Sequence, residues 1–226
     1  MGTYLFGDTG ELLDSQFDAL SSLLDAGTFA RVERLGVTDG WRCLEVGGGG
    51  GSVANWLADV VAPSGHVTVT DLDISRLEER DNVTVLLEHD VVSNILPGNA
   101  YDLVHARLVL FYLPARDAVL RKLRDSLRPG GWLVLDEFDC LPLEVLKAAP
   151  DDAKLIMRVK NALLTLLQQA GAELAWGSAH REGVARHRSA RREWLPRGAG
   201  VGGRLTRLPA ARHQRTSGAR EAAVVR

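Results

Sequence analysis

A run of five glycines constrains this chain more than any other feature. Residues 47–51 are all glycine; they follow a short apolar segment, 41–46, and precede 52–57, where apolar residues begin to recur at helical spacing. A strand that passes through glycines into a helix brings backbone N–H groups and a helix N-terminus to one point, free of side chains. A flexible linker would not have patterned apolar elements on both sides. The sequence therefore predicts a ligand-binding turn.

Strand-like and helix-like patterns alternate around this turn. After the strand at 41–46, further strands are predicted at 66–70, at 83–87, within 96–107 and at 132–138. Each connection is long enough for a right-handed crossover, so we expect an α/β fold with a doubly wound, mainly parallel sheet and helices on both faces. The predicted helices cover residues 9–35 with a break at Gly27, residues 52 to about 61, and residues 74–80, 114–127 and 151–172.

A carboxylate indicates which ligand the turn binds. Glu45, Gly47, Gly49 and Gly51 form Glu-x-Gly-x-Gly-x-Gly, which resembles motif I of the class I S-adenosylmethionine (SAM) dependent methyltransferases. The resemblance implies that Glu45 helps hold the cationic amino-acid end of SAM and that the glycines admit its body. Gly49, Gly51 and Ala54 also fit a dinucleotide fingerprint, but a carboxylate beside a pyrophosphate would bring no benefit.

The strands that follow agree with the same family. Asp71 ends the second strand about 20 residues after the glycines, where an acidic residue can accept the ribose hydroxyls of an adenosine cofactor. The resemblance implies that Leu72 flanks the adenine ring and that Asp90, after the third strand, accepts a hydrogen bond from its amine. Asp90 as a turn or helix cap is the alternative, and Asp73 is a candidate N-cap for the helix at 74–80.

Two later segments extend the resemblance over residues 36–140. Tyr-Asp-Leu-Val at 101–104 resembles the family's fourth strand, and Leu-Arg-Pro-Gly-Gly at 127–131 its turn into the fifth. We expect Arg107, just past the fourth strand, to bind the cofactor or an anionic substrate, or else to pair with a neighbouring carboxylate. The resemblance also implies that N-terminal helices close over SAM, which makes Tyr4 either a pocket residue or an anchor for the first helix.

Methyl transfer requires mainly the positioning of donor and acceptor. A hydroxyl acceptor would also need a base within reach. His105 is the first candidate, unless it is a satisfied histidine at a strand end, and Asp136 or Glu137 comes next. The resemblance implies a small-molecule acceptor, in a pocket shaped by the helical segment 141–176.

The C-terminal segment 177–226 differs sharply from the rest. Residues 1–176 have 15 Lys and Arg against 26 Asp and Glu, whereas residues 177–226 have 12 Arg and 3 Glu. Arg, Ala and Gly dominate this tail, which shows no strand or helix period, so we expect it to be disordered or an out-of-frame reading of GC-rich coding DNA. The family's last two strands would then be missing. A basic arm that binds nucleic acid is the less favoured alternative.

Composition narrows the remaining possibilities. No stretch of about 18 apolar residues is present, and Cys43 and Cys140 form neither a disulfide framework nor a metal cluster. We therefore expect a soluble, cytoplasmic protein with no metal and no membrane contact, of unknown oligomeric state. The expected domains are a helical cap (1–36), a SAM-binding core (37–140), the pocket segment (141–176) and the tail (177–226).

Two function classes, an enzyme and a non-catalytic protein, follow from these features. The favoured class is a SAM-dependent methyltransferase acting on a small molecule. The alternatives are a truncated, non-catalytic SAM-fold protein with a nucleic-acid-binding tail and, less favoured, a nicotinamide-dependent oxidoreductase.

Overall fold

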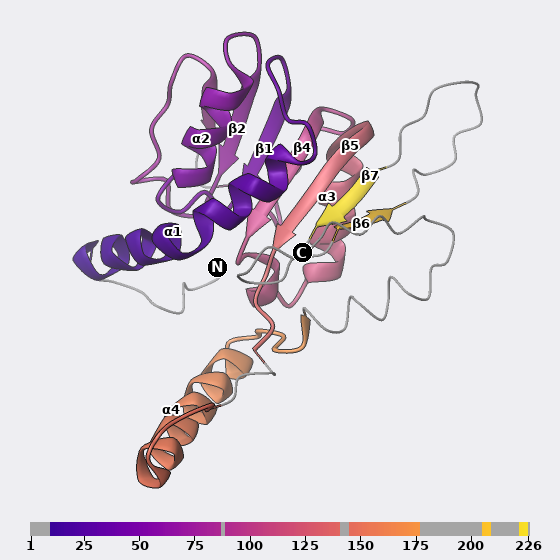
Figure 1. The fold of residues 1–226 in the computed structure, drawn as a ribbon. Coiled ribbons are helices and arrows are strands. Elements are labelled where there is room, and N and C mark those ends of the chain that lie inside the picture. The colour runs from indigo at the N-terminus through magenta and orange to yellow at the C-terminus, as the bar shows by residue number, and fades with distance from the viewer. Residues whose placement is uncertain (1–9, 87–88, 141–144, 177–204, 209–221, 226) are drawn as a thin grey trace.

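The computed structural model describes residues 10–86, 89–140, 145–176, 205–208 and 222–225 (Figure 1). A twisted sheet forms its centre, with strand order β3-β2-β1-β4-β5-β7-β6. The strands are β1 (Arg42–Val46), β2 (His66–Thr70), β3 (Val83–Leu86), β4 (Tyr101–Arg107), β5 (Leu127–Asp136), β6 (Leu205–Leu208) and β7 (Ala222–Val225). The first five strands are mutually parallel, which confirms the predicted doubly wound α/β fold.

Helices cover both faces of the sheet. The helices of the described residues are α1 (Gly10–Glu33), α2 (Ser52–Val61), the 3-10 helix η1 (Leu110–Tyr112), α3 (Arg116–Ser126) and α4 (Pro150–Gln169). Successive residues of a strand point to opposite faces, so Cys43 packs in one buried cluster with α2 while Leu44 and Val46 pack in the other with α3. Figure 1 shows most of α4 standing away from the sheet.

Helix α1 lies on the same face as α2. Val32 is fully buried there, and the ring of Phe29 stacks on that of Trp56 of α2, with centroids 4.3 Å apart. The predicted break at Gly27 is wrong, because α1 runs through it without interruption. A glycine within a helix costs only about 1 kcal/mol, and side chains on both sides of Gly27 hold α1 to the sheet, as described below.

Three other boundaries differ from those predicted. Residues 74–80 form no helix; the Asp73 carboxylate instead accepts the Ser75 N–H at 3.0 Å and makes a local turn. Helix α3 begins at Arg116 rather than Pro114, because the preceding segment forms η1. Leu127 belongs to β5, where it pairs with Tyr101 of β4; the register between these two strands shifts between Tyr101 and Leu103.

The end of the sheet also departs from expectation. The sequence predicts that two final strands are missing, but β7 pairs with β5 in parallel and β6 pairs with β7 antiparallel. Each of these strands has four residues, and a four-residue run is too short for its period to be recognised in an Arg- and Gly-rich background. The other tail residues lie outside the described part of the chain, so their predicted disorder or out-of-frame origin stays a prediction.

Candidate functional site

The glycine turn lies at the carboxyl end of β1. Gly47, Gly49 and Gly51 have φ of 72°, 52° and 80°, values that side chains disfavour. A Cβ on Gly47 would collide with the Val109 side chain, and one on Gly49 would lie 2.9 Å from Phe17 of α1. Only glycine fits at these positions, so the turn at the carboxyl end of β1 consists of backbone without side chains. This is the property that binding the body of SAM requires.

The predicted ribose ligand lies against that turn. Asp71 follows β2, and its Oδ2 accepts the Gly49 N–H at 2.8 Å, while its Oδ1 accepts the Asp73 N–H at 3.1 Å. Leu72 beside it is half exposed. The structure thus brings the glycines, Asp71 and Leu72 together at one edge of the sheet. Their contacts with ribose and adenine remain predictions.

Asp90, another predicted cofactor residue, makes hydrogen bonds within its own turn. The carboxylate of Asp90 accepts the Val92 N–H at 2.8 Å and the Ser93 hydroxyl at 2.9 Å, which is the turn-capping role that the sequence left open. The hydrogen bond from Val92 is the main reason why the pKa of Asp90 is lowered. Tyr4 lies outside the described residues.

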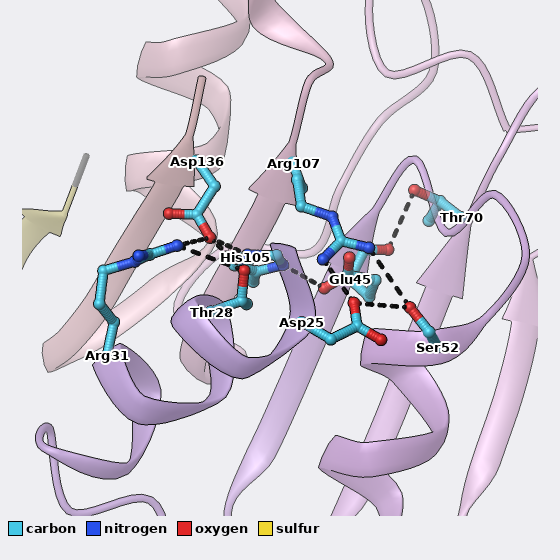
Figure 2. Close-up of polar contacts among 9 residues, drawn as sticks. All are labelled: Asp25, Thr28, Arg31, Glu45, Ser52, Thr70, His105, Arg107 and Asp136. Carbon is cyan, nitrogen blue, oxygen red and sulfur yellow. Dashed lines mark hydrogen bonds and ion pairs between the residues drawn. The ribbon is translucent and has the colours of Figure 1, made fainter. Parts of the chain in front are cut away.

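Glu45 and His105 form a buried pair at the centre of the site (Figure 2). They are neighbours in the β1–β4 register, and His105 Nδ1 lies 2.6 Å from Glu45 Oε2. His105 Nε2 faces Asp136 Oδ2 at 3.6 Å from the other side. All three side chains are at least nine-tenths buried, so one imidazole lies between two carboxyl groups.

The electrostatics of this group favour a charged histidine. Burial alone would lower the pKa of His105, but the charges of Glu45 and Asp136 outweigh it and raise that pKa to about 9. Burial would raise the pKa of Asp136, yet His105 and Arg31 hold it well below its usual range. Burial raises the pKa of Glu45, and the charge of His105 opposes that rise. These interactions favour the protonated form of His105, which cannot act as a base.

Helix α1 completes the buried cluster. Thr28 is fully buried and donates its hydroxyl to Asp136 Oδ2 at 2.6 Å, and Arg31 reaches the same oxygen at 2.6 Å. Glu137 follows Asp136 at the end of β5. Its carboxylate accepts the N–H groups of Val109, Leu110 and Phe111 at 2.8–3.2 Å and so caps η1. Burial raises the pKa of Glu137 to about 7.

Arg107, at the end of β4, is paired with a carboxylate of α1. Its Nη1 lies 2.7 Å from Asp25 Oδ1, and its Nη2 donates to Ser52 Oγ at 3.3 Å. Ser52 in turn donates to Asp25 Oδ1 at 3.2 Å. Of the two roles that the sequence left open for Arg107, the structure shows the neighbouring carboxylate.

Sequence reasoning missed the contribution of α1 to this site. Ser21, Asp25, Thr28 and Val32 recur at steps of four, three and four, so they lie on one side of the helix. Leu12 and Leu23, in contrast, are exposed. The sequence signal for this contribution is a row of polar residues on the side of the helix that packs on the protein. Such a row indicates polar partners in the elements that the helix covers.

The described residues hold neither a metal cluster nor a membrane-length apolar helix. No group of three or more His, Cys, Asp or Glu side chains is placed to bind a metal ion within residues 10–86, 89–140 and 145–176. No helix among them is long and apolar enough to cross a membrane. Cys43 and Cys140 are both buried free thiols.

Comparison with known proteins gives a family. Residues 12–194 match the family described as a methyltransferase domain, a span that extends beyond residues 36–140, where the sequence motifs lie. The ubiquinone/menaquinone biosynthesis C-methyltransferase UbiE of Hahella chejuensis is 29% identical over 140 residues, 55% of either chain. UbiE of Pseudomonas putida F1 is 30% identical over 141 residues, 55% of this chain and 54% of the relative. The chain thus spans about half the length of the curated relatives it matches.

Solved structures with related folds include a SAM-dependent methyltransferase from Aquifex aeolicus, with a TM-score of 0.48 and 20% identity over 73% of this chain and 89% of that one. Another, from Mesorhizobium loti, has a TM-score of 0.38 and 25% identity over 42% and 45% of the two chains. The family match rests on the sequence and covers most of the chain. This protein is therefore a member of the methyltransferase domain family, as its glycine motif and strand-end residues predicted.

Proposed function

We propose that the protein transfers a methyl group from SAM to a small-molecule acceptor. The observation that carries the proposal is the glycine cradle at the end of β1, with three positive φ angles and the Asp71 carboxylate against it. A side-chain-free turn beside a carboxylate suits a nucleoside that carries a positive charge. A pyrophosphate would be repelled by Glu45 and Asp71 in the same place.

When bound, SAM would supply an electrophilic methyl group on a sulfonium. The chain's part is to hold donor and acceptor in line. In this proposal the glycines accommodate the body of the cofactor, Asp71 accepts its ribose hydroxyls, and Glu45 provides negative charge for its ammonium group. Leu72 offers an apolar surface for the adenine.

His105 serves as a positioning residue in this account. It is fully buried, and both its ring nitrogens face carboxylates. A protonated imidazole in that place fixes the orientation of Glu45 and offsets part of the cost of burying its charge. Asp136 and Glu137, the other base candidates, are engaged with α1 and η1. Positioning is therefore the main catalytic contribution that these side chains can make.

The acceptor is proposed from chemistry that the relatives' names indicate. The relatives reported above are named as C-methyltransferases of ubiquinone and menaquinone biosynthesis. An activated ring carbon can lose its proton to water after methylation, so it needs no buried base. We propose electron-rich aromatic or quinol carbons as the first acceptors to test.

An assay that follows transfer of the labelled methyl group of SAM to a panel of quinol, phenol and amine acceptors tests the proposal. The expected result is label in a quinol-type product with the wild-type chain and none with Gly49→Ala, which blocks the cradle. Label in a phenol ether or an amine instead would support the proposed methyl transfer but contradict the proposed carbon acceptor. Absence of label with every acceptor, from protein shown to be folded, would count against the proposed reaction.

A further inference from the structure

Asp25 of α1 reaches across the site to a pair of groups that together suit a carboxylate (Figure 2). Its Oδ1 lies 2.7 Å from Arg107 Nη1 and 3.2 Å from Ser52 Oγ, and Ser52 is itself 3.3 Å from Arg107 Nη2. Ser21, one turn before Asp25, donates to the same Ser52 hydroxyl at 3.2 Å. A guanidinium and a hydroxyl therefore converge on one carboxylate oxygen.

The position of these groups is what distinguishes them from an ordinary surface ion pair. Ser52 begins α2 directly after the glycine turn, and Arg107 ends β4, next to β1 in the sheet. Both lie at the carboxyl edge of the sheet, where doubly wound folds bind their ligands. The Arg107 and Asp25 side chains are 12% and 21% exposed, so water weakens this pair only in part.

Arg107 also complements Glu45. Arg107 is close enough for its charge to contribute to the electrostatic environment of Glu45, whose carboxylate belongs to the adjacent strand. An acidic group and a guanidinium side by side match the two charges of an α-amino acid, which carries an ammonium and a carboxylate. The amino-acid end of SAM has this pair of charges.

We infer that Arg107 and Ser52 form a binding site for the amino-acid carboxylate of the cofactor, and that Asp25 occupies this site as an internal competitor. The inference rests on the proposed function. Binding of SAM, or of its product S-adenosylhomocysteine (SAH), then requires Asp25 to leave Arg107. Since Asp25 belongs to α1, which also covers the glycine turn through Phe17, its release would couple cofactor binding to movement of this helix.

Calorimetric titration of the full-length chain with two ligands tests the inference. SAH carries the amino-acid group, whereas 5′-deoxy-5′-methylthioadenosine has the same nucleoside and thioether without it. Asp25→Asn removes the competing charge and keeps the side-chain shape. Asp18→Asn is the matched control, because Asp18 is an exposed aspartate on the same helix.

The expected result is that Asp25→Asn binds SAH about three- to fivefold more tightly than wild type, the range that a partly screened ion pair supports. Its affinity for methylthioadenosine should be unchanged, and Asp18→Asn should bind both ligands as wild type does. Ser52→Ala should weaken SAH alone. This second variant keeps the test decisive if Asp25→Asn fails to fold.

Three outcomes would overturn the inference. Unchanged or weaker SAH binding by Asp25→Asn would show that Asp25 does not compete, as would be expected if the carboxylate partner of Arg107 belonged to the methyl acceptor. Equal gains for both ligands would mean that the substitution merely loosens α1. If no folded variant binds either ligand, the proposed function itself fails, and this inference fails with it.

Discussion

His105 Nδ1 lies 2.6 Å from Glu45 Oε2, across neighbouring strands and away from solvent. This pair links the residue that defines the sequence motif to the residue that the sequence suggested as a base. The two flanking carboxyl groups raise the pKa of His105 in spite of its burial, and we propose that the charged imidazole holds Glu45 in place. The first predictions concern this pair.

Glu45→Gln should weaken SAH binding by about tenfold or more, because it removes the negative charge proposed to face the ammonium group. It should also lower the free energy of unfolding, since His105 loses its partner in a buried site. Calorimetry and urea unfolding measure the two effects. Glu33→Gln, an exposed change at the end of α1, is the control and should alter neither. Wild-type affinity in Glu45→Gln would reject the proposed role of the carboxylate.

The stability of the protein should fall as the pH rises through the titration of His105. Its pKa is raised from 6.5 to about 9 in the folded state, so the folded chain holds this proton more strongly than the unfolded chain does. The stability that it contributes is complete below about pH 6.5 and is lost as the pH rises through 9. Urea unfolding at pH 6.5, 7.5 and 9 should show the decline in wild type and a flatter profile in His105→Gln. An equal pH dependence of the free energy of unfolding in the two proteins would mean that a group other than His105 is responsible for it.

The fold was predictable from the sequence because its signals are local. The glycines at 47–51 and the strand periods each depend on neighbouring residues. The turn predicted at 127–131 is instead the start of β5, although Gly130 does take a positive φ, of 86°. The ends of helices were less predictable, because the ion pairs that hold α1 through Gly27 come from distant strands. Asp73 shows the same limit: it could cap a helix or a turn, and only the path of residues 74–80 decides.

The site was predicted in part. Glu45, Asp71 and Arg107 do gather at one edge, since they end parallel strands. The α1 residues that contact Arg107 and Asp136 could not be predicted, because Asp25 and Thr28 meet the sheet only after α1 has docked. Nor could the burial of His105 between two carboxyl groups, which depends on the β1–β4–β5 register.

Arg31→Gln should loosen α1. Arg31 Nη2 lies 2.6 Å from Asp136 Oδ2, and its loss leaves Asp136 with Thr28 and His105 alone. The free energy of unfolding should fall by about 1–3 kcal/mol. Hydrogen exchange in residues 24–33 should become faster than in wild type, by more than it does in α2. Arg34→Gln, an exposed change three residues on, should leave both unchanged. Identical exchange in α1 of Arg31→Gln and wild type would mean that other contacts hold the helix.

Gly49→Ala should damage both the fold and the cofactor site. The new Cβ would meet Phe17 at 2.9 Å at a φ of 52°, and left-handed backbone costs a side chain about 1–2 kcal/mol. We expect a loss of stability of that size, measured by thermal unfolding, together with loss of SAH binding. Gly98→Ala is the control, because its Cβ would be 3.6 Å from its nearest neighbour. Normal SAH affinity in Gly49→Ala would show that the ligand lies away from the turn.

Calorimetric titration of the purified, folded full-length chain with SAH and, separately, with NAD⁺ tests the central claim most directly. The proposed SAM site predicts saturable, one-to-one binding of SAH and no heat of binding with NAD⁺. Binding of NAD⁺ without SAH, or of neither compound, would contradict it.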